Sequence, residues 1–269
     1  MRKRILVVAL AVLVLCAYTA KDSLRSWHNE SFTTGEVLKY KVHYGPITAA
    51  EAVIDTSPTL YKVNNRVCYR ATVYGKTTSS FDLFLRIRDT WQSYIDTAAI
   101  LPQRSFRNIE EGKYRKKETV DFDHYSNTVA VETKKKNKTK EAETFKIPNN
   151  VQDIVSGFYY LRTLDFDKYR TGEVIKVQGF FDDEVFNMDV KYQGRETVST
   201  MAGDIRAIKL VPKMPNNKLF KGEDAVTVYL SDDKNKIPVL IQAQMFVGSV
   251  KVDLYEYKNL KHKIFLANK

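Results

Sequence analysis

The sequence predicts a mainly β protein, with an antiparallel, curved sheet that forms a barrel-like or sandwich architecture and one central helix packed on it. Three observations lead to this fold class. Apolar and polar residues alternate along most of the chain, the alternating runs follow one another at short intervals, and one stretch near the middle has helical periodicity instead.

The first alternating run shows the strand pattern most clearly. In residues 37–44, VLKYKVHY, the side chains of Leu38, Tyr40 and Val42 fall on one side of an extended chain, and those of Lys39 and Lys41 fall on the other. We therefore expect one face to pack and the other to meet water. Similar runs predict strands at residues 52–54, 67–74, 84–95, 117–122, 128–132, 174–181, 185–192, 205–211, 225–230, 239–245 and 250–257.

Residues 151–164 break this pattern and predict the helix. The apolar residues that recur there at helical spacing are Val151, Ile154, Val155, Phe158, Tyr159 and Leu161. Asn150 is the expected cap, with Pro148 just before it. Asp153 complements the helix dipole, and we expect it to pair with Arg162 or another basic residue. The apolar stripe should pack on the sheet and help to close the core.

The mature chain is expected to be a single β-rich domain over residues 21–269, with sheet halves at 34–147 and 171–260 joined by the helix. The sequence TGEV opens the first strand at residues 34–37 and recurs at 171–174, where it opens the first strand after the helix. This echo is compatible with a duplication. It is equally compatible with Gly-Glu being a good start for any strand.

The first 20 residues predict export. Arg2, Lys3 and Arg4 precede an apolar run over residues 5–17, and a polar segment follows, which is the layout of a signal peptide. The run is shorter than the ~20 apolar residues that span ~30 Å of hydrocarbon. We therefore expect residues 1–20 to be a cleaved signal peptide and the mature protein to work outside the cytoplasm.

Cys16, near the end of the apolar run, leaves a second outcome open. Cleavage before Cys16 by a lipoprotein signal peptidase would leave a lipidated thiol and a membrane-anchored chain, and Leu13 suits such a site although Leu15 is bulky for it. Cleavage after Ala20 has Tyr18 where a small residue is usual. We favour soluble release, and the intact mass of the mature protein distinguishes the two.

Removal of the leader leaves Cys68 as the remaining cysteine, so no intramolecular disulfide can form. Cys68 lies in a predicted strand with no His or second Cys nearby in sequence. We interpret it as a small buried hydrophobic residue and not as a reactive thiol.

The formal net charge of +11 becomes about +8 once the three basic leader residues are subtracted. We expect no nucleic-acid partner, because the chain is exported and its basic residues are spread along it. The run KKKNKTK at 134–140 is the exception. We interpret it as a solvated hairpin tip, and the alternative is a patch for anionic glycan or lipid headgroups, with peripheral association with a membrane.

The sequence offers no clear catalytic or metal-binding constellation, and no cofactor is expected. Ser156-Gly157 lacks the flanking glycines of a hydrolase nucleophile turn. The histidines at positions 28, 43, 124 and 262 lack metal-ligand spacing, and no P-loop, dinucleotide fingerprint or Cys-x-x-Cys is present. Asp121 and Asp123 would share a strand face, which is compatible with glycosidase chemistry, although an exposed face produces the same pattern.

A second acidic segment, SDDKNK at 231–236, is expected to form a hairpin turn between two strands, with Pro238 at the start of the second strand. Asp232 and Asp233 could hold calcium together with backbone carbonyls. The segment lacks the spaced oxygen ligands and the glycine of a dedicated calcium loop, so we favour a solvated turn.

Several short motifs, in order along the chain, resemble the family of the domain of unknown function DUF3108. These are TGEVLKY at 34–40 with YGPI at 44–47, VQDIVS at 151–156 with YYLR at 159–162, and YLSDD at 229–233 with IPV at 237–239 and VGSV at 247–250. The family comprises exported or lipid-anchored proteins of Gram-negative bacteria, so the resemblance implies a β-rich protein of the periplasm or cell envelope. It implies no activity and no catalytic residue.

The aromatic content directs the functional expectation. The chain has 16 Tyr, 14 Phe and 2 Trp, and a curved sheet that does not fully close leaves an apolar concavity. The leading hypothesis is a non-catalytic envelope protein that binds a lipid, a glycan or another amphipathic envelope molecule, or a partner protein, with ligand-binding residues and oligomeric state unknown. The alternatives are a polysaccharide hydrolase using Asp121, Asp123 or Asp232, and a structural assembly factor without a small ligand.

Overall fold

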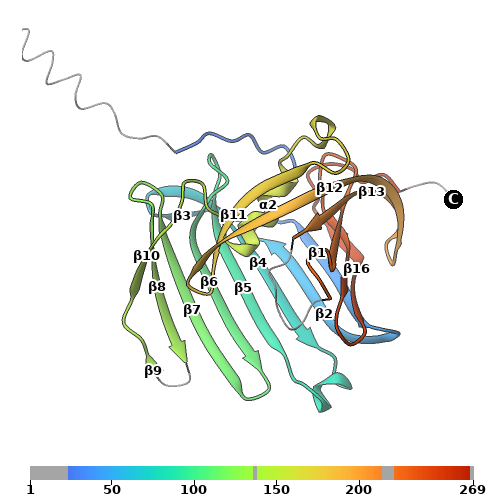
Figure 1. The fold of residues 1–269 in the computed structure, drawn as a ribbon, viewed down its shortest axis with the longest axis horizontal. Helices are drawn as coiled ribbons and strands as arrows, with labels where there is room; N and C mark the ends of the chain where they lie inside the picture. Colours follow the sequence, from blue (N-terminus) through green and yellow to red (C-terminus); the bar gives the residue numbers. More distant parts are fainter. Residues whose placement is uncertain (1–23, 136–137, 214–220, 267–269) are drawn as a thin grey trace, which may run out of the picture.

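The computed structural model describes residues 24–135, 138–213 and 221–266. Over these residues the chain forms one sixteen-stranded sheet in which every pair of neighbouring strands is antiparallel, together with one α-helix and two short 3-10 helices (Figure 1). The predicted fold class, a curved antiparallel sheet with one helix, is confirmed.

The strands that precede the helix are β1 (Val37–Tyr44), β2 (Ile47–Thr56), β3 (Tyr61–Val63), β4 (Arg66–Thr77), β5 (Arg88–Asp96), β6 (Pro102–Glu111), β7 (Tyr114–Asp123), β8 (Thr128–Lys135), β9 (Lys138–Thr139) and β10 (Glu143–Lys146). The strands that follow it are β11 (Val174–Phe181), β12 (Glu184–Thr200), β13 (Gly203–Pro212), β14 (Val226–Ser231), β15 (Pro238–Gln244) and β16 (Ser249–Lys258). The helix is α2 (Ile154–Arg162), and the 3-10 helices are η1 (Phe81–Leu83) and η2 (Phe166–Lys168).

The strand order is β10-β8-β7-β6-β5-β4-β2-β1-β16-β15-β14-β13-β12-β11, with β3 paired to β4 and β9 paired to β8. The first and last strands of the chain are therefore neighbours in the middle of the sheet. The strands that precede the helix extend the sheet from β1 to the edge strand β10, and those that follow it extend the sheet from β16 to the edge strand β11.

The two edge strands approach each other, because the sheet curls. A cluster of apolar side chains fills the seam between them, and Phe145 of β10 and Phe180 of β11 lie with ring centroids 5.7 Å apart. The segment before the helix also binds one edge: the Gln152 N–H donates to Gln178 O, and the Phe180 N–H donates to Gln152 O. Side chains and one short bridge thus close the seam in place of a continuous hydrogen-bonded ladder.

Antiparallel pairing places the turns at two ends of the curled sheet. We call the end with α2, the 97–101 segment and the 232–237 turn the helix end. We call the opposite end, with the β1–β2 turn, the β4–β5 loop, the β6–β7 turn and the β15–β16 turn, the turn end. In Figure 1 these turns lie along the lower side of the molecule, and α2 lies above them.

The helix begins later than the sequence predicts. Its N-cap is Asp153, whose carboxylate accepts the Ser156 N–H at 2.6 Å while the Ser156 hydroxyl oxygen accepts the Asp153 N–H at 2.9 Å. The expected cap at Asn150 was wrong, because Asn150 has a φ of +60° and the chain there turns toward the sheet edge before the helix starts.

Most of the predicted strands are present, and β1 and β11 have the predicted bounds. The strand expected at 84–95 begins only at Arg88, since the preceding residues form η1 and an exposed loop at the turn end. The strand expected at 185–192 continues to Thr200 through a bulge, where Gly194 has a φ of +91°. Beyond this bulge β12 continues to pair with β13, whose buried residues belong to two apolar clusters, Ile205 and Ala207 to one and Ile208 and Leu210 to the other.

Candidate functional site

An apolar cavity of about 320 Å³ lies inside the curled sheet, between α2 and the inner faces of strands from both flanks. Its walls come from β1, β2, β4, β5, β15 and β16, and its roof is α2. The lining residues are Leu38, Tyr40, Val42, Ala52, Ile54, Val73, Trp91, Ile154, Val155, Phe158, Tyr159, Arg162, Pro238, Ile241 and Val252. Except for Arg162 and the two tyrosine hydroxyls, these side chains are apolar.

Strand alternation explains why the wall is apolar. Leu38 and Tyr40 of β1 are buried and line the cavity, as does Val42. On the opposite face, the Lys39 ammonium lies 3.0 Å from the Glu256 carboxylate, and Lys41 pairs with a carboxylate of β2. The predicted two-sided pattern of this strand is confirmed.

The polar groups around the roof already have partners. The Tyr40 hydroxyl donates to Pro238 O at 2.8 Å, and the Tyr159 hydroxyl lies 2.9 Å from Thr56 Oγ1. Burial raises the pKa of both phenols, so both remain neutral. Neither hydroxyl is therefore a free nucleophile or base in the cavity.

The one charged side chain in the lining is neutralised within the protein. Arg162 and Glu36 are both buried and form a bidentate pair, with Nη1–Oε1 at 2.6 Å and Nη2–Oε2 at 2.7 Å. Burial alone would lower the pKa of Arg162, but the Glu36 carboxylate outweighs burial and raises it. The expected Asp153–Arg162 pair was wrong. The carboxylate that pairs with Arg162 is Glu36, and Asp153 accepts a hydrogen bond from Ser93 instead.

Below the lining, toward the turn end, the interior is open at Gly75. Gly75 is opposite Ala52 in β2 and two residues from Val73, so it faces inward with both of these cavity residues. A Cβ added at Gly75 would meet no atom within 4 Å. The interior therefore has free space next to the cavity on its turn-end side.

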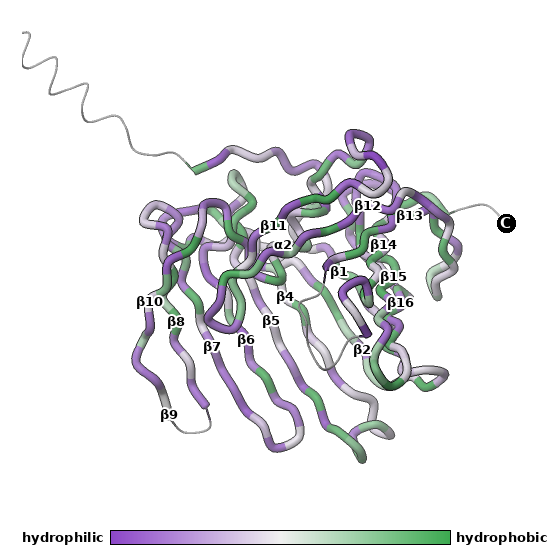
Figure 2. Tube along the Cα trace, in the orientation of Figure 1, coloured by the Kyte–Doolittle hydropathy of each residue, from purple (hydrophilic) through white to green (hydrophobic). Residues whose placement is uncertain are grey.

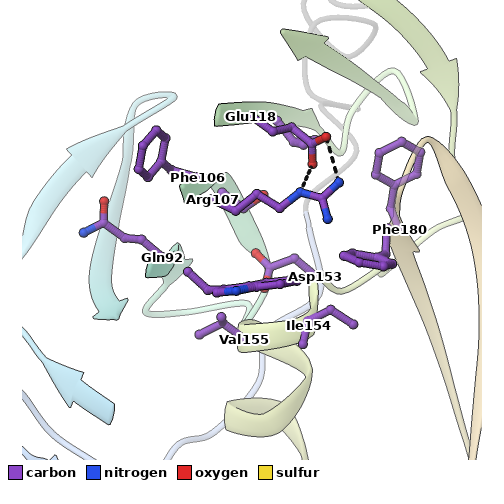
Figure 3. A pocket seen from close by; sticks show the side chains of 12 residues that line it. Gln92, Phe106, Arg107, Glu118, Asp153, Ile154, Val155 and Phe180 are labelled. Carbon is purple, nitrogen blue, oxygen red and sulfur yellow. Dashed lines mark hydrogen bonds and ion pairs between the residues drawn. The ribbon is translucent and has the colours of Figure 1, made fainter. Parts of the chain in front are cut away.

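A small polar pocket adjoins the cavity and shares Trp91, Ile154 and Val155 with it. Figure 3 shows the labelled side chains of Arg107, Glu118 and Asp153 grouped around this pocket, beside Phe180. Its volume is about 30 Å³, which is roughly the share of one water molecule in the liquid and leaves no room for a substrate.

The carboxylate of Asp153 in this pocket is fully buried. Burial raises its pKa to about 6, although hydrogen bonds from Ser93 and Ser156 oppose the shift. The Ser93 hydroxyl donates to Asp153 Oδ2 at 2.6 Å. Since the same carboxylate caps α2, its surroundings account for a structural role that ties the helix to β5.

On the other side of the pocket, ion pairs hold the tip of the β11–β12 hairpin against the sheet. Arg107 Nε lies 2.6 Å from Glu118 Oε1, and its guanidinium lies over the Phe181 ring at 4.6 Å. Asp182 at the hairpin tip pairs with Arg107 and lies 3.2 Å from the Lys116 ammonium. Burial would raise the pKa of Asp182, but the hydrogen bond from Arg107 lowers it overall.

The carboxylates considered for hydrolysis have structural partners. Asp121 accepts a hydrogen bond from Arg104 at 2.5 Å, and Asp123 accepts the backbone N–H groups of Tyr125 and Ser126. The hydrogen bonds from Ser126 lower the pKa of Asp123, which is the wrong direction for a general acid. Asp121 and Asp123 both line one outer depression.

Asp232, the third such carboxylate, lies on the opposite flank and bridges Arg195 and Arg206 at 2.9 Å each. Its neighbour Asp233 accepts N–H groups within the 231–236 turn, from Asn235 at 2.7 Å and Lys236 at 3.1 Å. The predicted turn between two strands, with Pro238 opening the second, is confirmed. Within the residues that the structure describes, no group of three or more His, Cys, Asp or Glu side chains could hold a metal ion.

The histidines and Ser156 are also in separate structural contacts. The side chains of His124 and His262 contact backbone carbonyls, His43 contacts Thr48, and His28 contacts Glu30. Ser156 completes the helix cap. Cys68 is buried, and burial, with a smaller contribution from Asp96, raises its pKa to about 12, which confirms the interpretation as an inert core residue.

The predicted leader and Cys16 lie outside the described residues. The lysine run at 134–140 spans the β8–β9 turn: Lys134 pairs with Thr139, and Lys135 with Lys138, in antiparallel register. Its central residues, 136–137, lie outside the described part of the chain. Over the described residues, no helix has the length and hydropathy needed to cross a bilayer.

Sequence reasoning missed the residues that shape the cavity. Trp91 was placed in a predicted strand, and Gly75 directly follows another, but nothing in either run shows that both face one interior space. The available signal was the alternation itself, which puts Val73, Gly75 and their cross-strand neighbours on one face.

Comparison with known proteins supports the fold and the family. The family model described as protein of unknown function (DUF3108) matches residues 39–255. The chain is similar in structure to a β-barrel-like protein of the domain of unknown function DUF1849 from Brucella abortus, with a TM-score of 0.55, 7% identity, and coverage of 86% of this chain and 99% of that chain. No curated protein matches the sequence.

Two further solved structures have lower TM-scores of 0.36. One is described as a candidate exported protein with a YmcC-like fold from Bacteroides fragilis NCTC 9343, with 8% identity and coverage of 87% of this chain and 100% of that chain. The other is a candidate lipoprotein from Parabacteroides distasonis ATCC 8503, with 12% identity and coverage of 88% and 100%.

Proposed function

The chain belongs to the DUF3108 family, whose description assigns no activity, and we propose that it is a non-catalytic exported protein whose cavity binds the apolar part of an amphipathic, lipid-like molecule of the cell envelope. The observation that carries this proposal is the cavity itself, which is apolar, holds no free charge and adjoins open space at Gly75. Its volume of about 320 Å³ lies at the lower end of the ~300–1,000 Å³ range of small-molecule sites.

The small residues around the cavity support an occupant. Larger side chains at Ala52 or Gly75 would fill part of this space. Small residues at these positions therefore favour a cavity kept for a ligand.

The export part of the proposal rests on the predicted leader at residues 1–20. A periplasmic or envelope protein meets lipids and lipid-linked molecules, and the neutral lining selects for an acyl chain or a similar apolar group over a sugar. The matched Arg162–Glu36 pair supplies no attraction for a free anion.

Fatty-acid titration tests the binding. Trp91 lines the cavity and Trp27 does not, so the variant Trp27→Phe leaves Trp91 as the fluorescent reporter. We expect saturable quenching of Trp91 by a bromine-labelled palmitic acid. Purified protein that shows no saturable quenching, and that carries no lipid by mass spectrometry after native purification, would contradict the proposal and favour the structural assembly role.

A substitution at Gly75 locates the binding. In the Trp27→Phe background, Gly75→Leu places a side chain in the open space and should reduce the affinity for the fatty acid at least tenfold. The melting temperature should not fall, because glycine weakens a strand and a side chain that fits at this position should stabilise it. Thr90→Leu is the matched control, because Thr90 precedes inward-facing Trp91 in β5 and so faces outward. Equal affinity in both variants would place the ligand elsewhere.

A further inference from the structure

The turn end of the molecule exposes apolar side chains that the fold does not use. Among the described residues, the two most exposed large apolar side chains are Leu83 and Phe84 of the β4–β5 loop, at 86% and 84%, followed by Val247 of the β15–β16 turn at 75%. Phe246 of that turn is exposed at 63%. Apolar side chains exposed together at loop tips mark a surface that binds a partner or a membrane.

These tips belong to one continuous rim. The Gly45 N–H of the β1–β2 turn donates to Ser249 O at the start of β16, and the Thr78 N–H of the β4–β5 loop donates to Ala49 O near the start of β2. The β4–β5 loop in turn accepts a hydrogen bond at Arg86 O from the Gly112 N–H of the β6–β7 turn. Hydrogen bonds therefore join the bases of these loops around the turn end.

The rim continues into a basic flank. Lys113 in the β6–β7 turn and Lys134 and Lys135 at the end of β8 are exposed and form no ion pair within the described residues. Nearby, Asp82 pairs with Arg88, and Glu110 lies 3.7 Å from Arg115. Glu111, next to the β6–β7 turn, is exposed and forms no ion pair among the described residues, so it offsets part of the charge of the three lysines. In Figure 2 the β4–β5 loop tip is hydrophobic, and the β8–β9 segment is hydrophilic.

We propose that the turn end is a docking surface for a lipid bilayer with anionic headgroups. The side chains of Leu83, Phe84, Phe246 and Val247 enter the boundary between headgroups and acyl chains, and the three lysines contact lipid phosphates. Apolar insertion combined with basic residues is the pattern by which peripheral proteins bind anionic bilayers. A protein partner would not need unpaired lysines beside the apolar tips, so charge complementarity favours the bilayer.

This proposal is independent of whether the cavity holds a ligand, but the two fit together geometrically. The cavity adjoins open space at Gly75 on its turn-end side, so docking at this end would bring that opening toward the bilayer.

Vesicle sedimentation tests the docking surface. The probe is a set of vesicles of phosphatidylethanolamine and phosphatidylglycerol, compared with vesicles of phosphatidylcholine alone, and we expect the protein to bind the anionic set more tightly and to lose that binding in high salt. Phe84→Ser combined with Phe246→Ser should weaken binding about tenfold or more. Leu60→Ser combined with Met201→Ser, which removes exposed apolar residues at the helix end, is the control and should bind as the wild type does.

Charge variants distinguish binding through the three lysines of the turn end from binding that depends only on the net charge of the protein. Replacing Lys113, Lys134 and Lys135 by Gln should weaken binding by about fivefold per lysine. Replacing Lys62, Lys168 and Lys234 by Gln removes the same charge at the helix end and should have little effect. Equal losses in the two triple variants would overturn the proposed orientation.

A depth measurement completes the test. The variant Phe84→Trp should show quenching of its added fluorescence by bromine-labelled phospholipid, and Leu60→Trp should not. No vesicle binding by the wild type, or self-association through the apolar tips in sedimentation velocity, would overturn the proposal. The Phe84 and Phe246 variant should still bind soluble palmitic acid, so loss of docking is distinguishable from failure of the cavity to bind a ligand.

Discussion

At the scale of single residues, buried ionisable groups account for several of the main contacts between helix and sheet. Arg162 at the end of α2 pairs with Glu36, which is 126 positions away in sequence, and Asp153 at its start binds Ser93 of β5. Removing one member of a buried pair leaves an uncompensated charge, which is strongly destabilising. The two ends of α2 are therefore fixed by side chains that the local sequence around the helix does not contain.

Asp153 should make the stability of the protein depend on pH. Its pKa is about 6 in the folded protein and near its ordinary value of 3.8 when unfolded, so the folded state holds a proton more tightly. The resulting contribution to the free energy of unfolding is fully present below pH ~4 and is lost as the pH rises through 6. At ~1.4 kcal/mol per pKa unit, the loss amounts to about 3 kcal/mol. Asp153→Asn keeps a capping oxygen and removes the titration.

Urea unfolding at several pH values measures this effect. The difference in unfolding free energy between Asp153→Asn and the wild type should grow in favour of the variant between pH 4 and pH 6, and then stay constant. Comparing the two proteins cancels carboxylates such as Asp182, whose lowered pKa works in the opposite direction. A difference that does not vary with pH would show that Asp153 titrates normally.

Residue-scale expectations from sequence succeeded where the signal was local. The burial of Cys68 followed from its position in a predicted strand, and the turn at Asp233 followed from the composition of residues 231–236. The partner of Arg162 could not be predicted, because only the pairing of β1 with β16 and the return of the chain through α2 bring Glu36 beside it.

At the scale of elements, alternation predicted the strands with one apolar face and failed at β6. The inward residue Arg107 of β6 is charged, and the strand carries polar residues on both faces, so its sequence has no clear period of two. Arg107 can be buried because it pairs with Glu118 on the neighbouring strand β7 and with Asp182 at the tip of the β11–β12 hairpin. A strand whose inner face is polar is recognisable only once its partners are known.

The β11–β12 hairpin depends on a glycine for a steric reason. A Cβ at Gly179 would lie 2.4 Å from the Phe186 ring on the paired strand, so the ring would have to move. Gly179→Ala should therefore destabilise the protein by ~1–3 kcal/mol. Gly75→Ala, where a Cβ meets open space, should be neutral or stabilising by up to ~1 kcal/mol. Thermal unfolding of the pair measures this, and equal shifts in melting temperature would contradict the packing argument.

At the scale of the whole molecule, the sequence predicted a curled sheet but not its closure or its cavity. The strand order places β1 beside β16 and leaves β10 and β11 as edges, and no local pattern specifies this order. The cavity forms where inward residues of six strands from both flanks face α2, so it depends on the complete curl. The aromatic content indicated an apolar interior without showing which side chains leave space.

The seam between β10 and β11 should be the weakest part of the barrel-like sheet. The edges are joined by apolar packing around Phe180 and by the bridge at Gln152, whereas β1 and β16 share a long ladder. Elements held by few hydrogen bonds open locally at lower free energy than the centre of a sheet. Removing the Phe180 ring takes away a large part of the seam contact.

Hydrogen exchange of Phe180→Ala should show this directly. We expect amide protection in β10 and β11 to fall at least tenfold more than in β1 and β16, because the substitution costs ~3–5 kcal/mol of packing that the seam provides. Phe106→Ala, which removes a ring that is outside the seam cluster, is the control and should not produce a selective loss there. Equal loss of protection in every strand of the Phe180 variant would mean that the seam opens only with global unfolding, and that its side chains close the sheet as firmly as a ladder does.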